Sequence, residues 1–141
     1  MKHKTLIASA VMLALLSGCT DTTAPEHYEK AQIYIAEQQF SAAMIELKSA
    51  IQQQPNVAEY RLALGLLYLK NGESLAAEKE LARAIEYGSA VDVAILPWVR
   101  SLYLSGQFDK ILSSSPANLT ENLNDSLSVY KALAELELGD T

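Results

Sequence analysis

Small and large apolar residues recur along the chain at helical spacing, and the pattern repeats after 34 residues. When residues 25–58 are laid over residues 59–92, small residues fall on small ones and large apolar residues on large ones. A period of this length is typical of stacked helical hairpins, each of which buries its apolar face against its neighbours. The pattern therefore predicts an all-α fold, an α-solenoid of antiparallel helical hairpins.

The matched positions have a physical role in such a solenoid. Small residues let two helices approach to about 8–10 Å between their axes, and bulky residues fill the space that remains. Ten residues are predicted on this basis to pack one helix against the next: Ala31, Tyr34, Ala43, Leu47, Ala50, Gly65, Tyr68, Ala77, Leu81 and Ala84.

About three and a half repeats are expected. Their predicted bounds are 25–58, 59–91, a degenerate third at 92–118 and a partial fourth at 121–141. In the third repeat, Leu102-Tyr103-Leu104 echoes Leu67-Tyr68-Leu69 at a shift of 35, which predicts one residue gained inside its first helix. Pro97 lies within that helix, so the helix is expected to start near it or to bend there.

Four small or polar residues predict where helices end and begin. Asn71-Gly72 is a turn signal, and Gly72 can adopt the positive φ found just past a helix end. Ser41 and Ser74 are predicted to cap the second helices of their repeats.

A last helix is predicted over residues 121–138, with a broad apolar surface. We expect either a continuation of the solenoid beyond this helix, or a partner or second copy that covers it.

The order of small residue, tyrosine, alanine and large apolar residue resembles the tetratricopeptide repeat. In that family a concave face binds partners and is lined by the first helix of each repeat. The resemblance places eight residues on this face: Tyr28, Gln32, Ile35, Leu62, Leu66, Leu69, Lys70 and Leu104, with Ser101 as a further candidate. Such a lining, apolar with one cation, would suit an amphipathic helix or an extended apolar segment, unless further helices of the chain fill the groove.

The N-terminus has the layout of a secretory signal. A basic head, an apolar run over residues 5–16 and the pair Ser17-Gly18 follow one another, which predicts a signal peptide over residues 1–18. The apolar run is shorter than the roughly 20 residues that a membrane-spanning helix needs. The length of the apolar run therefore predicts a signal for export and not a permanent membrane span.

The only cysteine of the chain, Cys19, directly follows this signal. The segment Leu16-Ser17-Gly18-Cys19 resembles the bacterial lipobox, in which the cysteine carries lipid, and residues 19–24 are then a lipidated cysteine and its tether. The alternative is an ordinary signal peptide with an incidental cysteine. Thr20 implies sorting to the outer membrane, although Asp21 weakens that prediction.

Composition and charge argue against several classes of function. Removal of residues 1–18 leaves 123 residues, with 9 of the 11 basic residues against 17 acidic ones, a net charge of −8. Such an acidic chain lacks the basic surface that nucleic acid requires. His27 is then the one histidine, and no metal-ligand spacing or phosphate-binding loop is present in the sequence. We therefore expect neither an enzyme nor a cofactor.

A more specific resemblance covers about residues 19–115 together with the signal. It rests on four blocks of sequence: Ile45-x-Leu47-Lys48-x-Ala50, Pro55 with Ala58-Glu59-x-Arg61, Ala77-Glu78-Lys79-Glu80-Leu81, and Gly106-Gln107-Phe108. In this order, beside a lipobox, they resemble the repeat lipoproteins of the PEP-CTERM/exosortase system. The resemblance implies a periplasm-facing scaffold on the outer membrane that serves exopolysaccharide export or protein sorting. Members of that family are longer arrays, so this chain would correspond to their N-terminal portion.

Two other functions remain open from the sequence. A pilotin-like lipoprotein would escort a secretin or a type IV pilus component to the outer membrane, and its partner would distinguish it. The chain could also be the non-catalytic N-terminal segment of a larger envelope enzyme.

Overall fold

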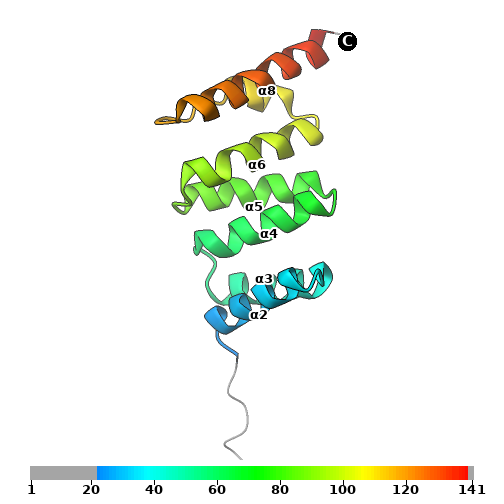
Figure 1. Ribbon diagram of the computed structural model, residues 1–141, viewed down its shortest axis with the longest axis vertical. Helices are drawn as coiled ribbons and strands as arrows, with labels where there is room; N and C mark the ends of the chain where they lie inside the picture. The colour runs from blue at the N-terminus through cyan, green and yellow to red at the C-terminus, as the bar shows by residue number, and fades with distance from the viewer. Residues whose placement is uncertain (1–21, 140–141) are drawn as a thin grey trace, which may run out of the picture.

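The computed structural model describes residues 22–139, and within this range it contains seven α-helices and no strand. The predicted all-α fold class is confirmed. The helices are α2 (Ala24–Ala36), α3 (Phe40–Gln53), α4 (Ala58–Lys70), α5 (Ser74–Glu86), α6 (Val91–Leu104), α7 (Phe108–Ser113) and α8 (Glu121–Gly139). They form one stack with α2 at one end and α8 at the other (Figure 1). The predicted signal peptide and Cys19 lie outside the described residues.

Helices α2 and α3 form the first hairpin, α4 and α5 the second, and α6 and the short α7 the third, while α8 packs on both α6 and α7. Helices α2 and α4 begin 34 residues apart, and α3, α5 and α7 also begin at intervals of 34 residues. None of the helices within residues 22–139 is long and apolar enough to cross a membrane.

The ten residues predicted to pack helix on helix lie inside the stack. Eight of them are buried, and Tyr34 and Tyr68 are half-buried against the cluster around Ala31 and Leu47. Gly65 of α4 shows why the position must be small, because a Cβ atom built on it would lie 2.6 Å from Cγ of Leu81 in α5. Helices α4 and α5 therefore touch at a point where no side chain fits.

The first helix begins one residue before its predicted start. Ala24 is its first residue and is buried, so it belongs to the folded part and not to a tether. The backbone N–H of the N-cap residue Thr23 donates a hydrogen bond of 2.7 Å to Oε2 of Glu26. This bond lowers the pKa of the Glu26 carboxyl.

The predicted serine caps are wrong. Helix α3 begins at Phe40 with Gln39 as its N-cap residue, and α5 begins at Ser74 with Glu73 in that place. The hairpin turns end in a residue with positive φ, Gly72 at 80° in the second hairpin. The next helix starts so soon after this residue that the serine already lies inside it.

The third hairpin keeps the 34-residue register, which corrects the predicted shift of 35. At a shift of 34, Val99 corresponds to Gly65 and Ser101 to Leu67, and all four of these residues are buried. Helix α6 begins at Val91 and continues through Pro97, so it does not start near the proline. Ser101 does not line a surface, because its hydroxyl is fully buried and donates a 2.6 Å hydrogen bond to the carbonyl of Trp98.

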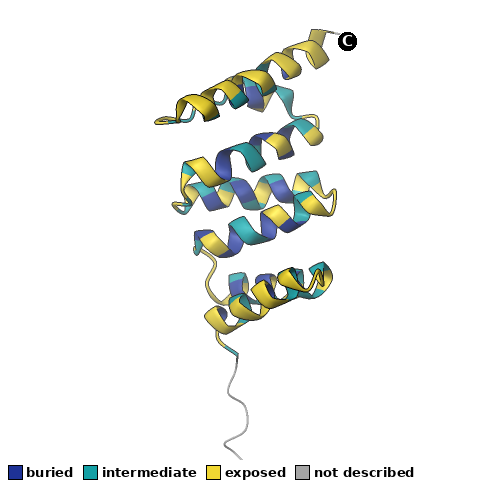
Figure 2. Ribbon diagram, in the orientation of Figure 1, coloured by how far each residue is buried: buried dark blue, intermediate teal, exposed yellow. Residues whose placement is uncertain are grey.

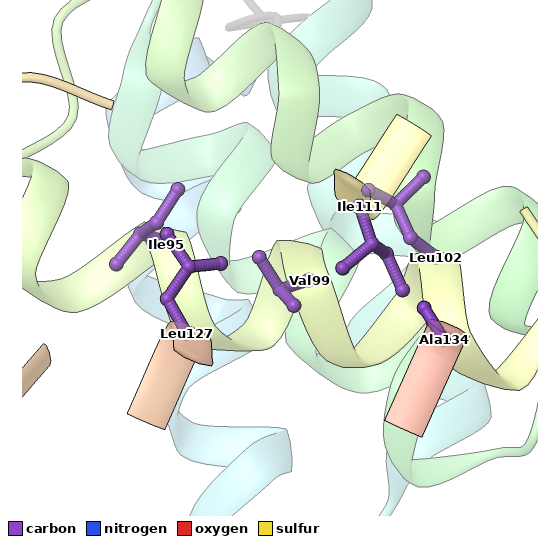
Figure 3. Close-up of a cluster of buried hydrophobic side chains, with 6 residues drawn as sticks. All are labelled: Ile95, Val99, Leu102, Ile111, Leu127 and Ala134. Carbon is purple, nitrogen blue, oxygen red and sulfur yellow. The ribbon is translucent and has the colours of Figure 1, made fainter. Parts of the chain in front are cut away.

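The end of the stack has its own apolar core. Its buried members come from three helices: Ile95, Val99 and Leu102 of α6, Ile111 of α7, and Leu127 and Ala134 of α8 (Figure 3). Helix α7 is only six residues long, so α8 lies against both α6 and α7. The last helix predicted from the sequence is present as α8, with one residue more than expected.

Candidate partner-binding groove

One face of the stack is lined by the first helix of each hairpin together with α8. Between α2 and α4 lies an open cavity of about 400 Å³. Six of the eight residues predicted for the groove line it: Tyr28, Gln32, Ile35, Leu62, Leu66 and Lys70. The structure thus brings together residues from two helices that begin 34 residues apart in the sequence.

Helix α4 contributes most of this lining because it is apolar on nearly every side. Gly65 is buried against Leu81 of α5 and Leu64 is buried against the first hairpin, while Leu66 is 42% exposed. Residues three and four apart share one face of a helix, so Leu62, Leu66 and Leu69 form a continuous apolar row. A row of leucines that faces solvent is a usual sign of a protein-binding surface.

A second cavity, of about 650 Å³, extends the first toward the other end of the stack. It lies between α4, α6 and α8 and shares Leu66 and Lys70 with the first. Its remaining lining residues are Leu69, Leu96, Pro97, Arg100, Ser126 and Tyr130.

A third cavity, of about 460 Å³, shares Arg100, Ser126 and Tyr130 with the second and adds Leu104, so all eight predicted residues line one of the three. We refer to the three connected cavities as the α2–α8 groove. It runs along the stack from the first helix to the last.

The sequence missed several groove residues, of which Arg100 is the most important. The predicted shift of 35 placed Ser101 at the position of Leu66, whereas the observed shift of 34 places Arg100 there and Leu96 at the position of Leu62. The unbroken 34-residue spacing from Gly72 to Gly106, both with positive φ, was the signal that could have found them.

Two positively charged side chains, those of Lys70 and Arg100, line this apolar groove. Nζ of Lys70 lies 4.0 Å from the ring centroid of Phe40, in a cation–π contact between α4 and the start of α3. Arg100 is exposed, and neither cation forms an ion pair with any residue in the range 22–139. Glu59 lines the groove at its α2 end. The groove therefore offers two uncompensated positive charges on an acidic protein.

Tyr28 closes the α2 end of the groove. Its ring centroid lies 4.9 Å from that of Tyr60, at an interplanar angle of 37°. Burial raises the pKa of the Tyr28 hydroxyl, and the nearby Glu59 carboxylate adds to this effect. The hydroxyl is therefore protonated at neutral pH and can donate a hydrogen bond.

The described residues hold no cluster of His, Cys, Asp and Glu that could bind a metal ion. His27 lies outside the groove, where its Nδ1 is 2.5 Å from Oε2 of Glu46 and links α2 to α3. The residues that line the groove are mostly apolar. Its chemistry is apolar contact with two positive charges, which is suited to binding.

Comparison with protein-family models and with curated proteins gives no match for this chain. Any assignment of function therefore rests on its own residues.

Proposed function

We propose that the chain is a non-catalytic tetratricopeptide-type scaffold that holds a segment of a partner protein in the α2–α8 groove. The single observation that carries this proposal is the continuity of the groove, in which Leu66 and Lys70 line two cavities at once. Stacked hairpins commonly present such extended surfaces to partners. The 34-residue spacing of the helices and the close contact of Gly65 with Leu81 support the tetratricopeptide type.

The partner segment that fits the groove is apolar and carries acidic residues. Apolar side chains would cover the leucine row, as in other complexes where an amphipathic segment lies in a groove. Acidic side chains would meet Lys70 and Arg100, neither of which forms an ion pair with another residue in the range 22–139. Complementary charge of this kind selects one partner over another and speeds association.

We further propose that the protein is anchored in the outer membrane through lipid on Cys19 and faces the periplasm. The lipobox resemblance of residues 16–19 supports the anchor. The resemblance to PEP-CTERM repeat lipoproteins supports a role in envelope assembly, as a scaffold for exopolysaccharide export or protein sorting. An anchored scaffold would hold its partner close to the membrane surface.

Mild detergent extraction, cross-linking and mass spectrometry of the captured proteins would test this function. The groove variant is Leu66→Asp, and Ile45→Asp is its control, because Ile45 is 66% exposed on α3 and lies outside the groove. We expect export or sorting proteins to be captured by the unmodified chain and by Ile45→Asp but lost with Leu66→Asp. Capture that survives Leu66→Asp would contradict the groove, and capture of a secretin would favour the pilotin function.

A further inference from the structure

Helix α8 carries an apolar face that no described residue covers. Val129, Leu133 and Leu136 are spaced four and three residues apart and are 59%, 37% and 60% exposed. The opposite face of the same helix is buried through Leu127 and Ala134. Figure 2 shows α8 exposed along much of its length. We call Val129, Leu133 and Leu136 the α8 stripe.

The charges beside the stripe are arranged in a particular order along the helix. Arg100 lines a cavity with Ser126 and Tyr130, so it lies beside the first half of α8. Glu137 is in the last turn of α8, where its Oε1 accepts a 3.0 Å hydrogen bond from the hydroxyl of Tyr103. Tyr103 and Arg100 line the same cavity, so Arg100 and Glu137 border the stripe on the same side and at opposite ends.

We propose that a second copy of this chain packs on the α8 stripe, with the two α8 helices antiparallel about a twofold axis. In that arrangement the last turn of one α8 lies beside the first half of the other. Arg100 of each copy then faces Glu137 of the second copy, which gives two equivalent ion pairs, and the two stripes cover each other. A parallel arrangement would instead place Arg100 beside Arg100 and Glu137 beside Glu137.

The twofold arrangement suits this surface for two reasons. Closed twofold dimers use the same patch on both copies, and the placement of Arg100 and Glu137 makes the patch here self-complementary in charge. The chain as a whole is acidic, so unspecific contact between copies is repulsive and a contact that pairs opposite charges is favoured. The dimer covers Val129 and Leu133, which line the third cavity, and it uses Arg100. The cavity between α2 and α4, with Lys70, shares no residue with this surface and stays open to a partner.

Analytical ultracentrifugation of the whole chain in mild detergent, over a wide range of concentration, would test the dimer. Leu136→Asp places a charge in the stripe, and we expect it to weaken the dimer by about a hundredfold or more. Leu75→Asp is the matched control, since Leu75 is 61% exposed on α5 and away from the stripe. Because both leucines are exposed, we expect both variants to keep the circular dichroism and melting temperature of the unmodified chain.

A charge exchange identifies the ion pairs. Arg100→Glu alone and Glu137→Arg alone should each weaken the dimer, by roughly tenfold. An equimolar mixture of these two variants should form a mixed dimer, because each contact then joins an acidic residue to a basic one. No effect within a single chain can produce this rescue.

A chain that stays monomeric at all concentrations would overturn the proposal. So would a dimer that Leu136→Asp leaves unchanged, or a mixture of the two charge variants that associates no better than each variant alone.

Discussion

The buried Arg61 of α4 forms an ion pair with the partly buried Glu80 of α5, in which Nη1 and Oε2 are 2.6 Å apart. Nε of the same guanidinium donates a 2.7 Å hydrogen bond to the carbonyl of Pro55, in the connection between α3 and α4. The guanidinium also lies 5.5 Å from the ring centroid of Tyr87. One side chain thus ties together the first hairpin, α4 and the end of α5. A buried arginine is tolerated only when its hydrogen bonds are made in this way.

Arg61→Met is expected to destabilise the fold by about 3 kcal/mol, because it leaves the Glu80 carboxylate and the Pro55 carbonyl without their partner. The measurement is the urea dependence of the circular dichroism signal. Arg83→Met is the control, since Arg83 is more than half exposed and its nitrogen is 3.9 Å from Glu80. We expect the control to change stability by less than about 1 kcal/mol. Equal effects of the two variants would show that burial of Arg61 is unimportant.

Gly65→Ala is expected to destabilise the fold by roughly 1–2 kcal/mol, although alanine is the better helix former. The new Cβ atom would lie 2.6 Å from Cγ and 3.3 Å from the backbone nitrogen of Leu81, and Leu81 is fully buried and cannot turn aside. Thermal unfolding of single and double variants would measure the effect. With Leu81→Ala in the same chain, the added cost of Gly65→Ala should vanish. A stable Gly65→Ala single variant would mean that α4 and α5 can separate at low cost.

We expect the folded protein to lose stability at high pH because of two tyrosines, Tyr28 and Tyr103. The hydrogen bond to Glu137 raises the pKa of Tyr103, and burial raises that of Tyr28, above the usual value near 10. The folded state therefore keeps these protons to higher pH than the unfolded state. Their stabilising contribution is fully present below pH 10 and is lost as the pH rises through the folded pKa values.

An ultraviolet titration of tyrosinate formation at low protein concentration would measure this directly. Glu137→Gln should move the titration of Tyr103 back toward the usual value, because the carboxylate charge is lost. Tyr28 is separate from Glu137 and serves as the internal control. An unchanged titration curve in Glu137→Gln would contradict the role of the hydrogen bond.

Cys19→Ser is expected to release the protein from membranes. A buried acyl chain contributes about 0.8 kcal/mol for each methylene group, and no helix within residues 22–139 could replace it as a membrane span. Cell fractionation with metabolic labelling by a fatty acid would follow both the anchor and its loss. If the serine variant still sediments with membranes, the lipid anchor on Cys19 is wrong.

The periodic part of the fold could be predicted from the sequence because its packing is local and repeated. Residues such as Ala43 and Ala77 occupy equal places in successive hairpins, so their burial follows from the 34-residue period. The groove positions of α2 and α4 follow from the same period. Each of these inferences needs only helical spacing and the size of a side chain.

The third hairpin could not be predicted in the same way, because its surroundings differ. The position that matches Leu81 is Ser115, which lies in the loop after the short helix α7. No side chain there excludes a Cβ atom, so Val99 takes the place of Gly65 and is buried against α8 instead. The local repetition of Leu-Tyr-Leu suggested the wrong register, although the spacing from Gly72 to Gly106 indicated the correct one. The ion pair of Arg61 and Glu80 was missed for a similar reason, since it joins two helices.

The contact between Lys70 and Phe40 bears on how tightly the groove can hold a partner. A free lysine side chain loses up to about 2 kcal/mol of rotamer entropy when it is fixed by a ligand. Lys70 already rests on the Phe40 ring before any partner arrives, so much of this entropy has been given up on folding. Within residues 22–139 no aromatic ring supports Arg100 in this way, so its side chain must be ordered during binding. Lys70 is therefore the preorganised half of the pair, and the affinity of the groove depends on an aromatic ring that the bound segment need not touch.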